Sequence, residues 1–341
     1  MPVNKRVKSG QSDARKVERE KGVPAEGARA AVIDIGSYSV RLAVGARVRS
    51  GGVRPVVESR DSTRLAQGLD MSGRLDLGAM EASVDAVVRM VAQARAHGAE
   101  RVAVVATCAV REAENGQRFV AMIRAETGLA VRVISGEEEG RLAFLGASRQ
   151  FDMRKGWSAV LDIGGGSTEL AIARSGEVRA VVSMPVGAVR LTERFGGPEL
   201  APAERYKDMR RFIDGLLNRR LKHVHGEAET LIATGGTATA LALIDLLSRH
   251  HGKVDAEDRV AVSKAVRGYA VERREVKEWV ARLREMSPKE RQGVPGLSRD
   301  RAAVIVAGLV ILHRTMKRLD CGHAVVSAGS IRDGVLAEML G

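Results

Sequence analysis

Two stretches of the chain repeat one pattern of hydrophobic and polar positions. Residues 31–44 read AVIDIGSYSVRLAV, and residues 159–172 read AVLDIGGGSTELAI. Each copy is an apolar run that ends in an aspartate, followed by small residues and a second apolar run. This pattern is typical of a buried strand, a tight turn and a returning strand. The repeat therefore predicts two related lobes that face each other across a cleft.

The rest of the chain alternates hairpins, helices and strands, which is typical of an α/β protein. In the first half we expect a disordered basic tail over 1–28, hairpin strands over 53–58 and 62–65, helices over 78–97 and 110–127, and strands over 102–106 and 131–134. In the second half we expect helices over 203–224, from the turn at 234–237 to 247, and over 271–286, 300–319 and 331–340, with strands over 230–233 and 324–326. We place the two domains at 29–146 and 147–341, each of an ordinary domain length.

The composition is that of an ordinary globular protein, with 45% hydrophobic and 28% charged residues. Apolar stretches such as 302–312 are too short to span a bilayer, and no apolar leader follows the polar start. Cys108 and Cys321 are the only cysteines, which gives neither a disulfide framework nor a zinc pattern. We therefore expect a cytoplasmic protein with no membrane partner.

The formal net charge of +13 favours a polyanionic partner. Aromatic residues make up only 3% of the chain, which leaves few surfaces for stacking nucleobases, and no nucleic-acid-binding motif is present. A polyphosphate-like substrate and a coding bias toward arginine both explain the charge. The basic segment at 210–222 is accordingly either a solvated helix face or a track for a polyanion.

The turn of each repeated hairpin is built from small residues. Gly36-Ser37 and Gly164-Gly165-Gly166-Ser167 lack bulk, so their backbone N–H groups can approach a phosphate closely. Asp34 and Asp162 stand at the strand ends beside these turns, where carboxylates could hold a hard cation such as Mg²⁺. The two hairpins thus predict a phosphate-binding cleft with a metal ion.

Three consecutive glutamates follow the strand expected at 131–134. Ser135 and Glu138 have the spacing of a capping box, and acidic residues suit the N-terminus of a helix. Capping does not require Glu139 as well. Glu139 is therefore either a surface residue of the first helical turn or, if it points into the cleft, a general base for water.

Two further strand-to-helix junctions are candidate phosphate contacts. Arg111 follows the strand at 102–106, at the edge of the sheet where α/β proteins collect ligands, and could clamp phosphate oxygens or lie in solvent. Gly235, Gly236 and Thr237 open another helix and form either an anion cradle or a plain packing turn. No lysine follows with the spacing of a Walker loop.

Taken together, these residues resemble the Ppx/GppA phosphatase family of exopolyphosphatases and guanosine pentaphosphate phosphohydrolases. The resemblance runs from about residue 31 to 340 and is carried by seven motifs in the family's order: DIGSYSVRL, TCAVREAEN, ISGEEEGRLAFLG, DIGGGSTEL, MPVGAVRLTERF, ATGGTATALA and SIRDGVL. It implies an α/β fold of two actin-like, ribonuclease-H-type domains with the active site between them, in the short two-domain form. Tyr38 stands where the family usually has asparagine.

The resemblance also implies a reaction, the hydrolysis of a terminal phosphoanhydride with Mg²⁺ as cofactor. The implied catalytic residues are Glu139, which activates water, and Arg111, which offsets phosphoryl charge. The implied phosphate contacts are Gly36, Ser37, Ser39, Gly164, Gly165, Gly166, Ser167, Gly235, Gly236 and Thr237. The implied metal ligands are Asp34, Asp162 and Glu169.

The substrate stays open between two molecules that both offer a terminal phosphoanhydride, inorganic polyphosphate and pppGpp. The positive charge favours polyphosphate. A non-catalytic regulator that binds polyphosphate or (p)ppGpp and a kinase of the same fold are the rival functions. Members of the family are often dimers, so a homodimer is an expected assembly, and no specific nucleic-acid partner is expected.

Overall fold

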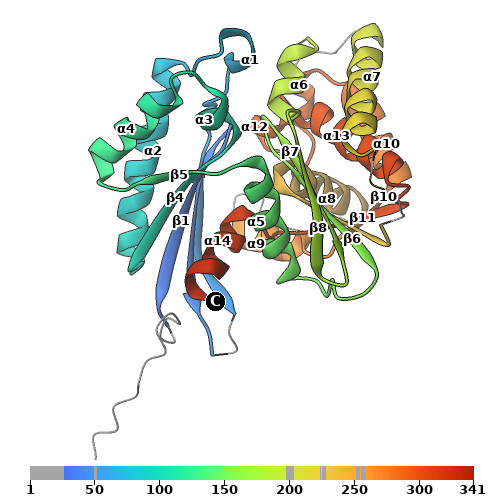
Figure 1. Ribbon diagram of the computed structural model, residues 1–341. Helices are drawn as coiled ribbons and strands as arrows, with labels where there is room; N and C mark the ends of the chain where they lie inside the picture. The colour runs from blue at the N-terminus through green and yellow to red at the C-terminus, as the bar shows by residue number, and fades with distance from the viewer. Residues whose placement is uncertain are drawn as a thin grey trace, which may run out of the picture.

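The computed structural model describes residues 27–49, 52–196, 203–222, 224, 228–250, 254 and 259–341. The tail expected over 1–28 therefore lies almost wholly outside the described residues. The described chain forms two mixed β-sheets with helices packed on their faces (Figure 1). None of its helices has the length and apolarity needed to cross a membrane.

The first sheet has the strand order β3-β2-β1-β4-β5. Its strands are β1 (Arg29–Ile35), β2 (Val40–Arg47), β3 (Val53–Asp61), β4 (Arg101–Ala106) and β5 (Val131–Val133). The first three strands form an antiparallel meander, and β4 and β5 extend it in parallel from β1. This confirms the first predicted hairpin.

The second sheet repeats this arrangement, with the order β10-β11-β9-β6-β7-β8. Its strands are β6 (Trp157–Ile163), β7 (Thr168–Arg174), β8 (Glu177–Met184), β9 (Thr230–Thr234), β10 (Ala270–Glu272) and β11 (His323–Val326). Again β6, β7 and β8 form a meander, and β9 and β11 run parallel to β6. The duplication expected from the two hairpins therefore extends to five strands of each sheet.

Fourteen helices accompany the sheets in the described part of the chain. They are α1 (Leu69–Ser72), α2 (Leu77–Ala96), α3 (Cys108–Glu112), α4 (Gly116–Thr127), α5 (Gly136–Ser148), α6 (Ala188–Arg194), α7 (Ala203–Arg220), α8 (Gly235–His250), α9 (Arg259–Val266), α10 (Arg273–Arg284), α11 (Pro288–Arg291), α12 (Arg299–Ala302), α13 (Ile305–Arg318) and α14 (Ile331–Leu340). We call the first sheet with α1–α4 the first lobe, and the second sheet with α6–α13 the second lobe. Helices α5 and α14 lie between the two sheets (Figure 1).

Alternation along the strands explains how both faces of each sheet are covered. On β1, Ile33 and Ile35 are buried toward α2 and α4, whereas Ala30 and Val32 are buried in the cluster that includes α14. Successive side chains of a strand point to opposite faces, so an uninterrupted apolar run predicts a strand that is buried on both. The same holds for β6, where Leu161 is buried in the core around α13 and Val160 is buried against α5.

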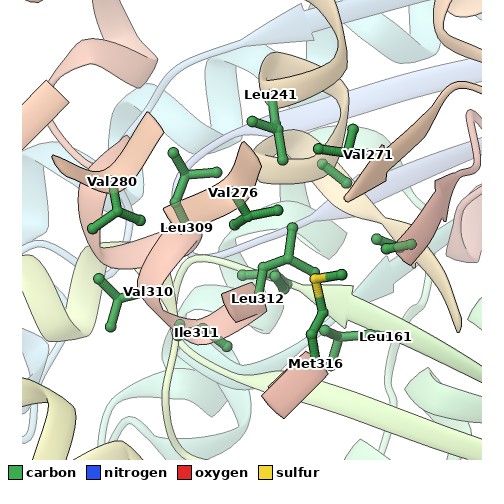
Figure 2. Close-up of a cluster of buried hydrophobic side chains, with 14 of the residues drawn as sticks. Leu161, Leu241, Val271, Val276, Val280, Leu309, Val310, Ile311, Leu312 and Met316 are labelled. Carbon is green, nitrogen blue, oxygen red and sulfur yellow. The ribbon is translucent and has the colours of Figure 1, made fainter. Parts of the chain in front are cut away.

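Helix α13 is the centre of the larger core. Figure 2 shows Leu309, Leu312 and Met316 of this helix packed among side chains of α8, α10, β6 and β10. Helix α13 is buried around most of its circumference, as expected for a helix that is hydrophobic on several faces. This core makes the second lobe a stable support for the strand ends that build the cleft.

The domain division at 29–146 and 147–341 stays a prediction, and two helices complicate it. Helix α14 belongs by sequence to the second segment but packs on β1, β2 and α5. Helix α5 belongs by sequence to the first segment but packs on β6, β7 and β8 of the second sheet, as well as on α14. The two segments are therefore joined by helices that each contact the sheet of the other.

Several predicted elements differ from the structure. The strand predicted at 62–65 is wrong. Arg64 and Ala66 donate their N–H groups to the carbonyls of Tyr38 and Ser37 and not to a neighbouring strand. The helix expected at 110–127 is broken into α3 and α4, because the amide of Asn115 binds both backbone groups of Leu75.

One more helix begins later than expected, another is interrupted, and two strands, β8 and β10, were not predicted. The helix expected from 271 begins at Arg273, because residues 270–272 pair with β11 and Glu272 forms a capping box with Glu275. The helix expected at 300–319 is interrupted between α12 and α13. Strand β8 follows the second hairpin and was not predicted, although its apolar residues alternate with charged ones at the start.

Candidate active site

A cavity of about 70 Å³ lies between the two repeated hairpins. It is formed at the carboxyl ends of β1, β6 and β9, which is where open α/β sheets bind ligands. Most of the predicted site residues line it: Asp34, Gly36, Ser37, Ser39, Glu139, Asp162, Gly164, Gly165, Gly166, Ser167, Gly235 and Gly236. The fold thus brings together residues from four separate segments of the chain.

The turns at 36–37 and 164–167 lie so close together that the second turn has room only for glycine. A Cβ atom on Gly166 would lie 2.6 Å from Oγ of Ser37, and one on Gly165 would lie 3.1 Å from Cβ of the same serine. Side chains on the second turn would therefore push the lobes apart. Bare backbone on this turn leaves its N–H groups accessible to an anion in the cleft.

Glu139 lies inside this cavity and is only 5% exposed. It is in the first turn of α5, whose N-cap is Ser135, as the sequence predicts. Burial, followed by the charges of Glu169 and Asp162, raises the pKa of Glu139 well above its usual value, and Arg111 opposes that shift. The glutamate therefore points into the cleft and is not a surface residue of the first helical turn.

Arg111 stands behind Glu139 and does not line the cavity. Its Nη1 donates to the carbonyl of Ile134 at 2.7 Å and lies 3.4 Å from Oε2 of Glu139. The side chain of Arg111 is a quarter exposed, so it is not a fully solvated residue, and it forms no wall of the cleft. This position lets Arg111 orient and partly neutralise the glutamate.

Asp162 and Glu169 are paired across β6 and β7, so two carboxylates share one face of the sheet. Burial, with Asp34 next, raises the pKa of Asp162 to about 6. Burial, with Asp162 next, raises the pKa of Glu169 to about 8, although Ser183 donates to its Oε1 at 2.8 Å. Glu169 lies behind the wall of the cavity and completes a concentration of negative charge around Glu139.

The carboxylates fit a hard divalent cation. Oδ1 of Asp34 and Oε2 of Glu169 are buried and accept no hydrogen bond in the described part of the chain. Within that part, no three histidine, cysteine, aspartate or glutamate residues form a ready-made metal cage. Mg²⁺ commonly keeps several water ligands and uses one or two carboxylates together with substrate phosphates, which suits such an incomplete set.

One predicted phosphate contact has its side chain elsewhere. Thr237 is buried and packs against Gly308 of α13, and its side chain does not line the cavity. Gly235 and Gly236, in contrast, line the cavity at the N-terminus of α8. Only the backbone N–H of Thr237 remains available to an anion at this helix end.

Three arginines that the sequence reasoning did not assign to the site also line the cleft: Arg41, Arg301 and Arg332. They continue into an adjoining cavity of about 130 Å³, which Arg60 lines as well. Burial, with the nearby charges of Arg332 and Arg301, lowers the pKa of Arg41 well below its usual range. The sequence could have identified Arg41 as a site residue. It is a charged residue in an apolar strand, and it occupies the repeat position that Glu169 holds in the second copy.

The basic segment at 210–222 does not reach this site. It lies on α7, which packs against α13 at the outer side of the second lobe (Figure 1). Arg211 pairs with Asp208 on the same helix, and Arg210 lies over the ring of Tyr206. None of its side chains is among the residues that line the two cavities.

The sequence and structure are similar to those of known proteins over nearly the whole chain. Exopolyphosphatase 2 of Mycobacterium tuberculosis is 31% identical over 333 residues, covering 92% of this chain and 99% of that protein. Exopolyphosphatase 1 of Mycobacterium leprae is 29% identical over 314 residues, covering 92% and 89%. The crystal structure of the Ppx/GppA family member of Aquifex aeolicus has a TM-score of 0.74 and 31% identity, covering 91% of this chain and 96% of that one.

These similarities confirm the expected fold, which is α/β with two sheets of the actin-like type. A sequence model of the Ppx/GppA phosphatase family matches residues 43–341, a span that includes Arg111, Glu139 and the whole second hairpin. The chain therefore belongs to the Ppx/GppA phosphatase family.

Proposed function

We propose that this protein is an exopolyphosphatase, which hydrolyses the terminal phosphoanhydride of inorganic polyphosphate and releases orthophosphate. The observation that carries the proposal is the position of Glu139, a buried carboxylate inside a cleft between two turns of bare backbone. The arginine-lined cavity next to this cleft offers positive charge beyond the terminal phosphate. Two relatives of similar length are named as exopolyphosphatases.

Different residues would bind the terminal phosphate and the phosphates that follow it. The terminal phosphate would lie between the turns at 36–37 and 164–167 and the N-terminus of α8, where backbone N–H groups donate to its oxygens. Arg301 lies directly against Gly236, so its guanidinium meets the same helix end. The next phosphates of the chain would lie among Arg41, Arg332 and Arg301.

Glu139 would accept a proton from the water that attacks the terminal phosphorus. It must be ionised to do so, and Arg111 favours the ionised form. When bound, Mg²⁺ would be held by Asp34, Asp162 and Glu169 and would neutralise charge on the phosphoryl oxygens. We propose the same cation as the reason that four buried carboxylates can stand close together.

A second substrate, pppGpp, is favoured by a specific observation. The adjoining cavity is lined not only by arginines but also by Ala240, Leu243 and Val262, which could contact a nucleobase. The terminal phosphoanhydride of pppGpp would lie beside Glu139, as that of polyphosphate would. The positive charge of the cavity favours polyphosphate. Its apolar side favours pppGpp, so the two substrates should be compared directly.

Phosphate release from purified protein with Mg²⁺ tests the proposal, with long-chain polyphosphate and pppGpp measured side by side. We expect release from polyphosphate and a loss of about 10²- to 10⁴-fold in kcat for Glu139→Gln. The matched control is Glu138→Gln, which changes the preceding glutamate of the same helical turn. The side chain of Glu138 is 41% exposed and paired with Arg132, and it does not line the cavity, so this variant should keep its activity.

Three results would contradict the proposal in different ways. Faster release from pppGpp would keep the role of Glu139 and change the substrate. Tight binding of polyphosphate without release would make the protein a non-catalytic regulator. Transfer of phosphate from ATP to a small molecule would make it a kinase.

A further inference from the structure

Tyr38 is the most enclosed aromatic residue between the lobes. It belongs to the turn between β1 and β2 and is 6% exposed. Its ring packs with Ala188 and Val189 of α6 and with Val304, all of the second lobe. A large side chain of the first lobe is thus held inside an apolar pocket of the other.

The hydroxyl of Tyr38 makes a second connection to that lobe. It donates to the carbonyl oxygen of Asp300 at 2.9 Å. Asp300 is on the one-turn helix α12, next to Arg301, whose guanidinium lines both cavities. The hydrogen bond therefore fixes the backbone that carries a residue of the cleft.

The carboxylate of Asp300 is held by the first lobe as well. Ser62 donates to its Oδ2 at 2.5 Å, and Nη2 of Arg60 lies 3.6 Å from the same atom. The guanidinium groups of Arg60 and Arg301 each lie 5.7 Å from the centre of the Tyr38 ring, within the range of cation–π attraction. Contacts from three residues of the first lobe thus converge on α12.

The loop after β3 holds Tyr38 in this place. Arg64 and Ala66 donate to the carbonyls of Tyr38 and Ser37 at 3.0 and 2.9 Å. Arg64 adopts a φ of 52°, in the left-handed region that non-glycine residues rarely occupy. Such a conformation persists where surrounding contacts require it, and here those contacts fasten the turn of Tyr38.

We propose that Tyr38 is a positioning residue, which ties the first lobe to α12 and thereby sets both the separation of the lobes and the place of Arg301 in the cleft. It acts through Asp300 and Arg301 and not on the reacting atoms. Loss of its hydroxyl would let the lobes separate and would weaken binding of the anionic chain more than the chemical step.

The separation of the lobes can be measured directly by electron–electron resonance between two nitroxide labels. Glu81→Cys on α2 and Glu278→Cys on α10 supply exposed attachment sites, one on each lobe, and the two native cysteines are buried. We expect longer and broader distances in Tyr38→Phe, which removes only the hydroxyl, and a larger change in Tyr38→Leu, which also removes the ring.

The matched control is Tyr206→Phe, the same change at a ring that also lies beside two arginines, Arg210 and Arg284, but on α7. Its distances should equal those of the parent protein. Unchanged distances in both Tyr38→Phe and Tyr38→Leu would overturn the proposal, and the first variant keeps the ring packing in case the second does not fold.

Kinetics supply the second readout, with long-chain polyphosphate as the probe. We expect Tyr38→Phe to raise KM about 2- to 10-fold, the usual effect of one hydrogen bond, with a smaller change in kcat. An equal loss in kcat with no change in KM would overturn the assigned role. The kinetic readout rests on the proposed function, whereas the label distances do not, so failure of one can be told from failure of the other.

Discussion

The hairpins β1–β2 and β6–β7 share one backbone pattern and place the same aspartate opposite different partners. Asp34 is in register with Arg41, whereas Asp162 is in register with Glu169. The first hairpin therefore carries a base beside its acid and the second carries two acids. The same position of the repeat thus carries a positive charge in the first hairpin and a carboxyl group in the second.

The difference extends to how each charge is neutralised. Burial raises the pKa of Asp34, but Arg332 and Arg41 oppose the shift, so the protein itself supplies its counter-charge. Burial raises the pKa of Glu169 to about 8 and that of Asp162 to about 6, although Arg41 and Arg332 oppose the shift of Asp162 and Arg111 opposes that of Glu169. The second hairpin thus holds two buried carboxylates with raised pKa values, whereas the first holds one, with an arginine as its register partner.

Among changes to the two hairpins, the largest expected effect comes from removing one charge from each. Glu169→Gln should lower activity at fixed Mg²⁺ by about 10- to 100-fold and shift the Mg²⁺ titration, because it removes a candidate ligand. Arg41→Gln should instead raise KM for polyphosphate by about tenfold, because it removes a charged contact. Steady-state rates against Mg²⁺ and against polyphosphate, measured for both variants, separate the two roles.

Glu177→Gln on β8 is the control for loss of a carboxylate, since Glu177 is exposed and paired with Arg179. It should leave both titrations unchanged. A shift of the Mg²⁺ curve by Arg41→Gln alone would reverse the assignment of the two hairpins.

An intermediate effect is expected from adding a methyl group to each turn. In Gly166→Ala the new Cβ would lie 2.6 Å from Oγ of Ser37 and 2.9 Å from Sγ of Cys108, so the lobes or these side chains must move. Overpacking of this kind costs about 1–3 kcal/mol, and we expect a lower Tm and a loss of about tenfold in kcat/KM. In Gly36→Ala the nearest contact is the carbonyl of Ser39 at 3.3 Å. Calorimetry should therefore show a smaller fall in Tm, and kinetics a smaller loss of kcat/KM, than for Gly166→Ala. Equal losses in the two variants would contradict the closer approach of the second turn.

The smallest effect is a dependence of stability on pH in the absence of Mg²⁺. The folded pKa values of Asp162 and Glu169 lie above their usual values, so the folded state holds protons more tightly than the unfolded chain. Their contribution to stability is full below about pH 4 and is lost as pH rises through about 6 and about 8. Calorimetry from pH 5 to 8.5 should therefore show a falling Tm, with a flatter profile for Glu169→Gln. Added Mg²⁺ should restore Tm most at high pH, and a Tm that rises with pH in its absence would contradict this account.

Local patterns predicted much of this molecule. The apolar runs with their aspartates located both hairpins, and the surplus glutamate after Ser135 located the candidate base, because strand alternation and helix capping depend on neighbours in sequence. Arg301 and the ties of Tyr38 were not predicted, since they depend on residues more than 200 positions apart, as in the bond from Tyr38 to Asp300. The break at Asn115 has the same cause, because its partner Leu75 belongs to another segment.

Helix α14 has a consequence for how the chain reaches this structure. The inner face of β1, with Ala30 and Val32, is covered by Val335 and Leu336 from the far end of the sequence. During synthesis the part of that apolar face covered by α14 therefore stays exposed until residues 331–340 have emerged. Contacts of such long sequence separation slow folding and leave partly folded chains prone to aggregation. The first lobe is accordingly the region we expect to need a chaperone.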